Sequence, residues 1–229
     1  NMARFSHLPL PEEVLDYLDE KGIMHYAEIP LWGSPNSLVN KNELLPKIWL
    51  TKLVNSQFNH PAIIGWSVGN EIGNNPGVTE YVKDAINFVR TRLDTTRLVS
   101  DVNYSAGKND NDPAQFAEMI LYNMYGAKWL KYNINEVYKR YPKPLFMAEF
   151  GDALNEDEVN LGILPLKAMV DSMRKLPYLT GASLWTFNDY RSSYQHTAEN
   201  WSTKPSENRA WGIVNVHRHK KKAYYEARR

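Results

Sequence analysis

Ile63-Ile64-Gly65-Trp66-Ser67-Val68-Gly69-Asn70-Glu71 is a mainly apolar run that ends in an amide and a carboxylate. Pro144-Leu145-Phe146-Met147-Ala148-Glu149-Phe150-Gly151 repeats this layout, because Glu149 closes a wholly apolar stretch. Short apolar runs of this kind are typical of buried strands in a parallel sheet. In a parallel barrel, chemistry collects at the carboxyl ends of the strands. The two stretches therefore predict a barrel in which two strands each end in a carboxylate.

Strand-like and helical segments alternate along the rest of the chain. This alternation predicts βα units with right-handed crossovers, and hence the α/β class. No repeat, linker or low-complexity segment interrupts it, so we expect a single domain over residues 1–229. Strands are expected over 23–29, 62–69, 97–102, 119–124, 145–149 and 181–187, and helices over 10–21, 41–58, 79–93, 127–140, 164–175 and from 220 onward.

The number of strands falls short of a complete barrel. The expected strands number seven if the opening residues, around 4–7, form one of them. A barrel that lacks a strand exposes two open edges, and a complete (β/α)₈ barrel takes about 250 residues. We therefore predict a (β/α)₈ barrel without its first strand and helix, running from about the second strand to the start of the eighth helix.

The composition excludes several classes of partner. The 229 residues carry 27 basic and 26 acidic side chains, a net charge of +1, so no bulk field attracts nucleic acid or an anionic membrane surface. There is no cysteine, which excludes disulfides and thiolate metal sites but leaves the cellular compartment open. No stretch approaches the roughly 18 apolar residues that a membrane span needs. We expect neither nucleic acid nor a membrane as a partner.

Two strand-end carboxylates suit one reaction in particular. A retaining glycosidase needs one protonated carboxyl group and one ionised one, about 5–5.5 Å apart. Asn70, beside Glu71, would offer its amide to the 2-hydroxyl of a sugar, where hydrogen bonding strengthens in the transition state. A lone glutamate at a strand end is usually a solvated residue, but Glu71 and Glu149 in matching contexts favour catalysis.

The residues around these carboxylates match a family. Asn59-His60-Pro61, followed by the first stretch, closely resembles the acid/base signature of glycoside hydrolase family 2, which holds β-galactosidases, β-glucuronidases and β-mannosidases. The resemblance covers essentially the whole chain in order. It extends to Met2-Ala3-Arg4-Phe5-Ser6-His7-Leu8-Pro9 (second barrel strand), Tyr26-Ala27-Glu28-Ile29-Pro30-Leu31-Trp32 (third), Asn123-Met124-Tyr125-Gly126 (sixth) and Trp185-Thr186-Phe187-Asn188-Asp189 (eighth).

This resemblance implies roles for individual residues. It makes Glu71 the acid/base, Glu149 the nucleophile, and Tyr125 the phenol that hydrogen-bonds the nucleophile. It places Arg4 near the nucleophile, as a cation that keeps the carboxylate charged, and Trp185 under the sugar as a hydrophobic platform. The substrate-binding residues that it implies are Arg4, His7, Glu28, Asn70, Trp185, Asn188 and Asp189. The alternatives are a structural ion pair for Arg4, a satisfied core histidine for His7 and plain packing for Trp185.

The sugar is less well defined. Glucuronidases of the family hold the sugar carboxylate with an Asn-x-Lys motif, and the matching residues here are Asn208-Arg209-Ala210. Ala210 replaces the lysine, although Arg209 could supply a cation in a different geometry. This replacement favours a neutral sugar, and we expect a retaining exo-β-glycosidase that acts on β-galactosides. The alternatives are a β-glucuronidase or β-mannosidase on the same scaffold, a non-catalytic sugar-binding barrel, or an inactive truncated product.

Four expectations concern the surroundings of the site. The resemblance implies β-sandwich domains ahead of this chain, and no required metal or cofactor, since the Glu–His pair of the family's metal site is not found. The run His217-Arg218-His219-Lys220-Lys221-Lys222 is expected to be a solvated helix start rather than a nucleic-acid patch. Long loops at a catalytic face usually shape specificity. We expect this of the loop from Asp189 to Trp211, which holds Arg191, Tyr194, His196, Trp201 and Arg209.

Overall fold

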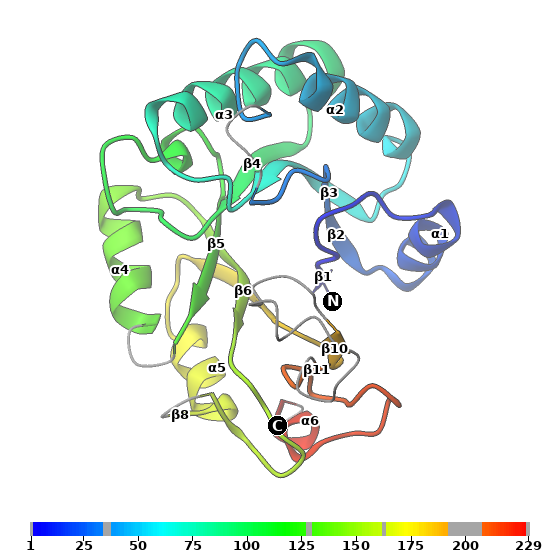
Figure 1. The fold of residues 1–229 in the computed structure, drawn as a ribbon, viewed down its shortest axis with the longest axis vertical. Coiled ribbons are helices and arrows are strands. Elements are labelled where there is room, and N and C mark those ends of the chain that lie inside the picture. Colours follow the sequence, from blue (N-terminus) through cyan, green and yellow to red (C-terminus); the bar gives the residue numbers. More distant parts are fainter. Residues whose placement is uncertain (1, 34–37, 127–129, 162–163, 192–207, 228–229) are drawn as a thin grey trace. The chain divides into compact units, whose positions relative to one another are not determined.

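The structure is a computed structural model that describes residues 2–33, 38–126, 130–161, 164–191 and 208–227 (Figure 1). The chain divides into two compact units. The first unit holds Asn1–Asn123 and Asn135–Ala148, and the second unit holds Met124–Ile134 and Glu149–Arg229. The expectation of a single domain stays a prediction.

The described strands include one seven-stranded sheet in which the strand order follows the chain. The registers described from the first to the fifth of these strands are all parallel. This order is what successive βα units with crossovers produce, so the predicted α/β class is confirmed. The opening strand lies at Met2–Ala3 rather than around 4–7. The strands are β1 (Met2–Ala3), β2 (Met24–Glu28), β3 (Ile63–Asn70), β4 (Leu98–Asn103), β5 (Ile120–Tyr125), β6 (Leu145–Gly151) and β9 (Leu179–Leu184).

The other elements are helices and short hairpins. No described helix combines the length and the apolar character that crossing a membrane requires. The helices are α1 (Glu12–Lys21), α2 (Leu44–Gln57), α3 (Pro76–Phe88), α4 (Leu130–Arg140), α5 (Leu166–Arg174) and α6 (Lys222–Ala227), with a π-helical turn over Val89–Leu93 and a 3₁₀ turn over Pro113–Gln115. Antiparallel pairs join β7 (Asn160–Leu161) to β8 (Leu164–Pro165), and β10 (Tyr190–Arg191) to β11 (Asn208–Arg209).

Several predicted boundaries were wrong, and capping explains two of them. Helix α2 begins at Leu44 rather than at 41, because the Glu43 carboxylate accepts a hydrogen bond from the Leu45 backbone N–H at 3.2 Å. Helix α3 begins at Pro76 rather than at 79. The Asn75 side chain accepts from the Val78 N–H at 3.1 Å, and proline suits a first helical turn.

The strand predicted over 181–187 was also shifted. Strand β9 runs from Leu179 to Leu184, and the chain then leaves the sheet. The backbone N–H of Trp185 donates to the Phe150 carbonyl at 2.8 Å, whereas that of Thr186 donates to the Trp211 carbonyl at 3.1 Å. The change of partner after a single residue ends the regular strand, which periodicity alone does not reveal.

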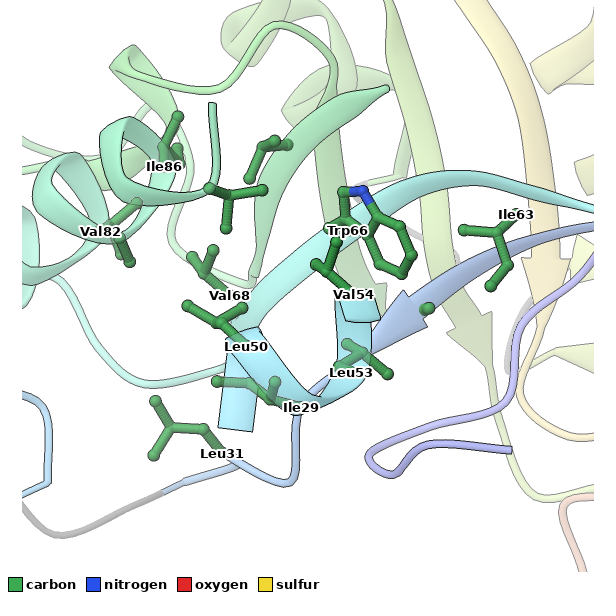
Figure 2. Packing of buried hydrophobic residues seen from close by; sticks show 14 of the residues in the cluster. Ile29, Leu31, Leu50, Leu53, Val54, Ile63, Trp66, Val68, Val82 and Ile86 are labelled. Atoms are coloured by element: carbon green, nitrogen blue, oxygen red, sulfur yellow. The ribbon is translucent and has the colours of Figure 1, made fainter. Parts of the chain in front are cut away.

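Two apolar clusters fill the first unit. The larger one joins α1, α2 and α3 to β2, β3 and β4, and Figure 2 shows Leu50, Leu53 and Val54 of α2 gathered with Trp66 and Val68 of β3. These helices lie on the same side of the strands in Figure 1. A smaller cluster contains Tyr26, Val102, Leu121, Phe146 and Ala148. Since the strands β2, β3 and β4 contribute to both clusters, they are buried on both faces, as their apolar runs predict.

Candidate active site

Glu71 lies immediately after β3, in the first unit, on an unusual backbone. Its φ is 52°, in the left-handed region that non-glycine residues rarely adopt. Its backbone N–H donates to the Val102 carbonyl at 2.9 Å, which ties this turn to β4. The side chain of Asn123, on β5, donates from Nδ2 to Glu71 Oε1 at 2.9 Å. Residues held in sparsely populated conformations cluster at functional sites, so the turn supports a functional role for Glu71.

Asn70 precedes Glu71 and is almost completely buried. Its Oδ1 accepts from Arg4 Nη2 at 2.9 Å and from Asn123 Nδ2 at 3.2 Å. Its Nδ2 has no hydrogen-bond partner among the described residues. A buried donor without a partner is costly, and donation to a bound hydroxyl group would satisfy it. This geometry suits the predicted contact between Asn70 and the sugar.

Glu28 is the centre of the polar network in the first unit. Its side chain is 1% exposed, and its oxygens accept from Arg4 Nη2 at 3.2 Å and from Ser67 Oγ at 2.9 Å. The Nδ1 atom of His7 lies 2.8 Å from Glu28 Oε1. Burial raises the pKa of this carboxyl group, but the Arg4 charge and the hydrogen bonds from His7 and Ser67 outweigh burial and leave the pKa below its usual range. Glu28 is therefore an ionised residue that holds other side chains in place.

His7 stands between this carboxylate and an aromatic ring. Its ring stacks on Trp32, with centroids 5.1 Å apart and an interplanar angle of 1°. Its backbone φ is 94°, which is rare for a residue with a side chain. If Nδ1 carries a proton for Glu28, the neutral imidazole has its hydrogen-bond acceptor on Nε2. The structure thus brings Arg4, His7, Glu28 and Asn70 together, and the position of Arg4 near the nucleophile stays a prediction.

An irregularity in β3 makes this assembly possible. Ser67 and Asn70 are three residues apart, so regular alternation would point them to opposite faces of the sheet. The register between β3 and β4 shifts between these two residues. A bulge of this kind re-aims side chains and is common beside active sites. Ser67 and Asn70 consequently both reach the group formed by Arg4 and Glu28.

Glu149 lies in β6, in the second unit, and is 5% exposed. The Tyr125 hydroxyl, at the end of β5, donates to Glu149 Oε2. The Tyr125 ring meets Trp211 edge-on, with centroids 5.4 Å apart. A phenol O–H bonded to a carboxylate oxygen fixes the direction in which that carboxylate points. The predicted pairing of Tyr125 with Glu149 is present.

Trp185 has an aromatic neighbour that the sequence did not suggest. Its Nε1 donates to the Tyr190 hydroxyl at 3.0 Å, and the two rings meet edge-on. Burial and the negative charge of Glu149 raise the pKa of Tyr190, while the hydrogen bond from Trp185 and the charge of Arg209 oppose the rise. Arg209 faces Tyr190 across the β10–β11 pair. The second unit thus places Tyr190 within reach of the charge of the predicted nucleophile, with Trp185 and Arg209 beside Tyr190.

Asn188 and Asp189 make structural contacts. The oxygen of the Asn188 side chain accepts from Arg218 at 2.6 Å. Asp189 Oδ1 accepts from Lys221 Nζ at 2.6 Å and from the Gly212 N–H at 2.9 Å. These bonds engage the Asn188 side-chain oxygen and one of the two Asp189 carboxylate oxygens, and substrate binding by the two residues stays a prediction. Lys221 is 2% exposed, so the expectation of a fully solvated basic run was wrong at this position.

One group of described residues has the spacing of metal ligands. Ligand atoms of Asp16, Asp19 and His60 lie within 4.8 Å of one another. Asp19 already accepts from the Ala62 N–H, and its second oxygen lies 2.7 Å from His60 Nδ1. These bonds tie α1 to the turn before β3 and explain His60 without a metal. Of the predicted loop residues, Tyr194, His196 and Trp201 lie outside the described residues.

Sequence reasoning missed some residues of this site. Asn123 belongs to the stretch that resembles the sixth barrel strand, and the resemblance implied no role for it. Its two-residue spacing from Tyr125 nevertheless puts both side chains on the same side of a strand. Ser67 carried no signal, because regular alternation points it away from Asn70. Tyr190 follows Asp189 directly, and only the β10–β11 pairing brings it beside Arg209.

Comparison with known proteins identifies the family. The sequence profile described as "Glycosyl hydrolases family 2, TIM barrel domain" matches residues 1–210. The chain belongs to glycosyl hydrolase family 2. Its fold is that of the family's (β/α)₈ barrel, of which the chain covers a part, and the predicted fold class and family are both confirmed.

Two curated relatives with sequence similarity to this chain are named β-glucuronidases. The rat β-glucuronidase is 29% identical over 222 residues, which cover 84% of this chain and 34% of the relative. The Bacteroides fragilis β-glucuronidase is 27% identical, with 93% of this chain and 30% of the relative covered. The chain spans about a third of the length of the curated relatives that it matches.

Solved structures show the same fold. The β-D-glucuronidase of Dictyoglomus thermophilum has a TM-score of 0.82 at 24% identity, covering 100% of this chain and 44% of that protein. A family 2 β-galacturonidase from Eisenbergiella tayi, bound to galacturonate, has a TM-score of 0.81 at 20% identity, covering 99% and 43%. At these identities the likeness establishes the fold alone.

Proposed function

We propose that this chain is the catalytic barrel of a retaining exo-β-glycosidase. One observation carries the proposal: in a family 2 chain, each strand-end glutamate has a hydrogen-bond donor suited to its role. Asn123 donates to Glu71, and Tyr125 donates to Glu149. The buried network of Arg4, Glu28 and Asn70 supports sugar binding beside Glu71.

The reaction would proceed by double displacement. A carboxylate oxygen of Glu149 forms a bond to the anomeric carbon, while the bond from that carbon to the leaving oxygen breaks. The Glu71 carboxyl group gives its proton to the leaving oxygen and becomes a carboxylate. In the second step, Glu71 takes a proton from water, whose oxygen displaces Glu149 and releases the sugar with its configuration retained. This mechanism requires the two carboxyl groups about 5–5.5 Å apart around one sugar.

A β-galactoside is the first candidate substrate. By resemblance to the Asn-x-Lys motif of the family's glucuronidases, Ala210 takes the place of the lysine that holds the sugar carboxylate. An alanine side chain provides no cation, and the Ala210 carbonyl accepts from the Leu154 N–H at 2.6 Å. A neutral sugar needs no cation at this position.

A β-glucuronide is the second candidate, and two observations favour it. The curated relatives at 26–30% identity are named β-glucuronidases. Arg209, beside Tyr190, supplies a cation one residue before Ala210. A guanidinium group can bind a carboxylate through two parallel hydrogen bonds, so it could take over the role of the lysine.

Aryl β-glycosides test the reaction and the sugar together. We expect Glu149→Gln to abolish turnover of p-nitrophenyl β-galactoside, and unchanged turnover would end the nucleophile assignment. Rates on the β-galactoside, β-glucuronide and β-mannoside identify the sugar. In a galactosidase, Arg209→Ala should leave β-galactoside turnover nearly unchanged. A preference for the glucuronide that Arg209→Ala removes would establish the second candidate.

A further inference from the structure

A series of hydrogen bonds links Arg4 to Glu71 through the side chains of Asn70 and Asn123, and each bond has a defined donor and acceptor. Arginine carries only donors. Because Arg4 Nη2 lies 2.9 Å from the side chain of Asn70, the amide atom that faces it must be the oxygen, Oδ1. The orientation of the Asn70 amide is therefore set by chemistry.

The orientation of the Asn70 amide in turn determines the orientation of the Asn123 amide. An Asn123 atom lies 3.2 Å from Asn70 Oδ1, and an oxygen there would repel it, so this atom must be the nitrogen, Nδ2. The same nitrogen lies 2.9 Å from Glu71 Oε1. An amide nitrogen has two hydrogens, and each has an acceptor here. Glu71 Oε1 is consequently an acceptor in every protonation state that keeps this network.

We infer that Asn123 is a positioning residue that places the transferable proton of Glu71 on Oε2. The inference deepens the proposed function and rests on it. A neutral carboxyl group accepts best through its carbonyl oxygen, so the bond from Asn123 makes Oε1 the carbonyl and Oε2 the hydroxyl. Oε2 then gives its proton to the leaving oxygen and later takes one from water. The same donor stabilises the carboxylate that remains between these steps.

Burial supports this assignment. Asn70 and Asn123 are each at most 1% exposed, so water cannot replace the bonds between them. Asn123 Oδ1 has no hydrogen-bond partner among the described residues, and a buried unsatisfied oxygen carries a cost. An apolar residue would avoid that cost. The hydrogen bond that Asn123 Nδ2 donates to Glu71 gives a functional reason for an amide at position 123.

The dependence on the leaving group tests this inference. In the purified protein, we compare kcat/KM for phenyl and 2,4-dinitrophenyl glycosides of the sugar that it hydrolyses. Phenol needs a proton to leave, whereas dinitrophenol does not. We expect Asn123→Ala to lower kcat/KM about 100-fold for the phenyl glycoside and less than about 3-fold for the dinitrophenyl glycoside. The basic limb of the pH profile should move to higher pH, because the ionised form of Glu71 loses a donor.

Two further variants keep the test decisive. Asn123→Asp preserves the shape of the side chain, and its carboxylate cannot donate when ionised, so the same split between substrates is expected even if Asn123→Ala folds poorly. Asn103→Ala removes another buried amide, on β4, that bonds Asp101 and Asp112 instead of Glu71, and it should affect both substrates equally. Equal losses in both Asn123 variants would overturn the inference alone. A wild-type protein inactive on every aryl glycoside would overturn the proposed function, and this inference with it.

Discussion

Arg4 and Glu28 form an ion pair that solvent does not reach. Nη2 of Arg4 lies 3.2 Å from Oε2 of Glu28, and the two side chains are 3% and 1% exposed. Three donors surround the carboxylate, so its negative charge is compensated within the first unit. A buried pair of this kind is costly to break from one side, because the remaining charge has no partner and no water.

Replacing Glu28 should therefore destabilise the protein strongly. Glu28→Gln keeps the shape but removes the charge that faces Arg4 and His7, and we expect a loss of about 3–5 kcal/mol in the free energy of unfolding, measured in urea. Glu80→Gln is the matched control, since its exposed pair with Lys41 should contribute less than about 1 kcal/mol. Equal stability of Glu28→Gln and the wild type would contradict a structural role for this carboxylate.

Asp101 should make stability fall as the pH rises. Burial, helped by the negative charge of Asp112, raises the pKa of Asp101 to about 7 in the folded protein from an ordinary value of 3.8. Between these two values the folded state holds one more proton than the unfolded state. The stability that Asp101 contributes is therefore fully present below pH 3.8 and is lost as the pH rises through 7. Across this pH range the Asp101 shift corresponds to a loss on the order of 4 kcal/mol in the free energy of unfolding.

The variant Asp101→Asn isolates that contribution. It carries no titrating proton, and the loss of stability between pH 5 and pH 8 in urea unfolding should become smaller than in the wild type. Asp110→Asn is the control, because its side chain is 99% exposed and should leave the slope unchanged. The same slope in Asp101→Asn and the wild type would show that Asp101 does not retain a proton.

The sequence predicts the fold correctly where burial of a strand depends on the local order of its apolar residues. The apolar runs of β3 and β6 predict buried strands, because burial on both faces leaves a direct mark on composition. The role of Glu28 left no such mark. Its partners Arg4, His7 and Ser67 lie 21 to 39 residues away, and a register shift in β3 brings Ser67 into reach. A contact that depends on a β-bulge cannot be predicted from the regular alternation of side chains along a strand.

Lys221 and Asp189 provide a test of the same kind in the second unit. Lys221 Nζ donates to Asp189 Oδ1 and to the Leu154 carbonyl, each at 2.6 Å, from a position that is 2% exposed. Lys221→Met leaves a poorly solvated carboxylate without its cation, and we expect a loss of about 3–5 kcal/mol in urea unfolding. Lys220→Met, at the exposed neighbouring position, should have little effect. Adding Asp189→Asn to Lys221→Met should restore part of the loss, and no recovery would argue against the ion pair.

Gly151 should be irreplaceable because of a close backbone contact. A Cβ atom at this position would lie 2.2 Å from the Trp185 carbonyl oxygen, which is a severe overlap with backbone. Gly151→Ala must therefore move Trp185 or the end of β6, where Glu149 lies two residues away. A displacement of about 1 Å can cost roughly 100-fold in rate, so we expect kcat on an aryl glycoside to fall by about that factor. Gly77→Ala in α3 is the control, because its Cβ would meet only the Asn75 side chain, at 3.3 Å. Full activity of Gly151→Ala would mean that the contact between β6 and Trp185 can relax without disturbing the nucleophile.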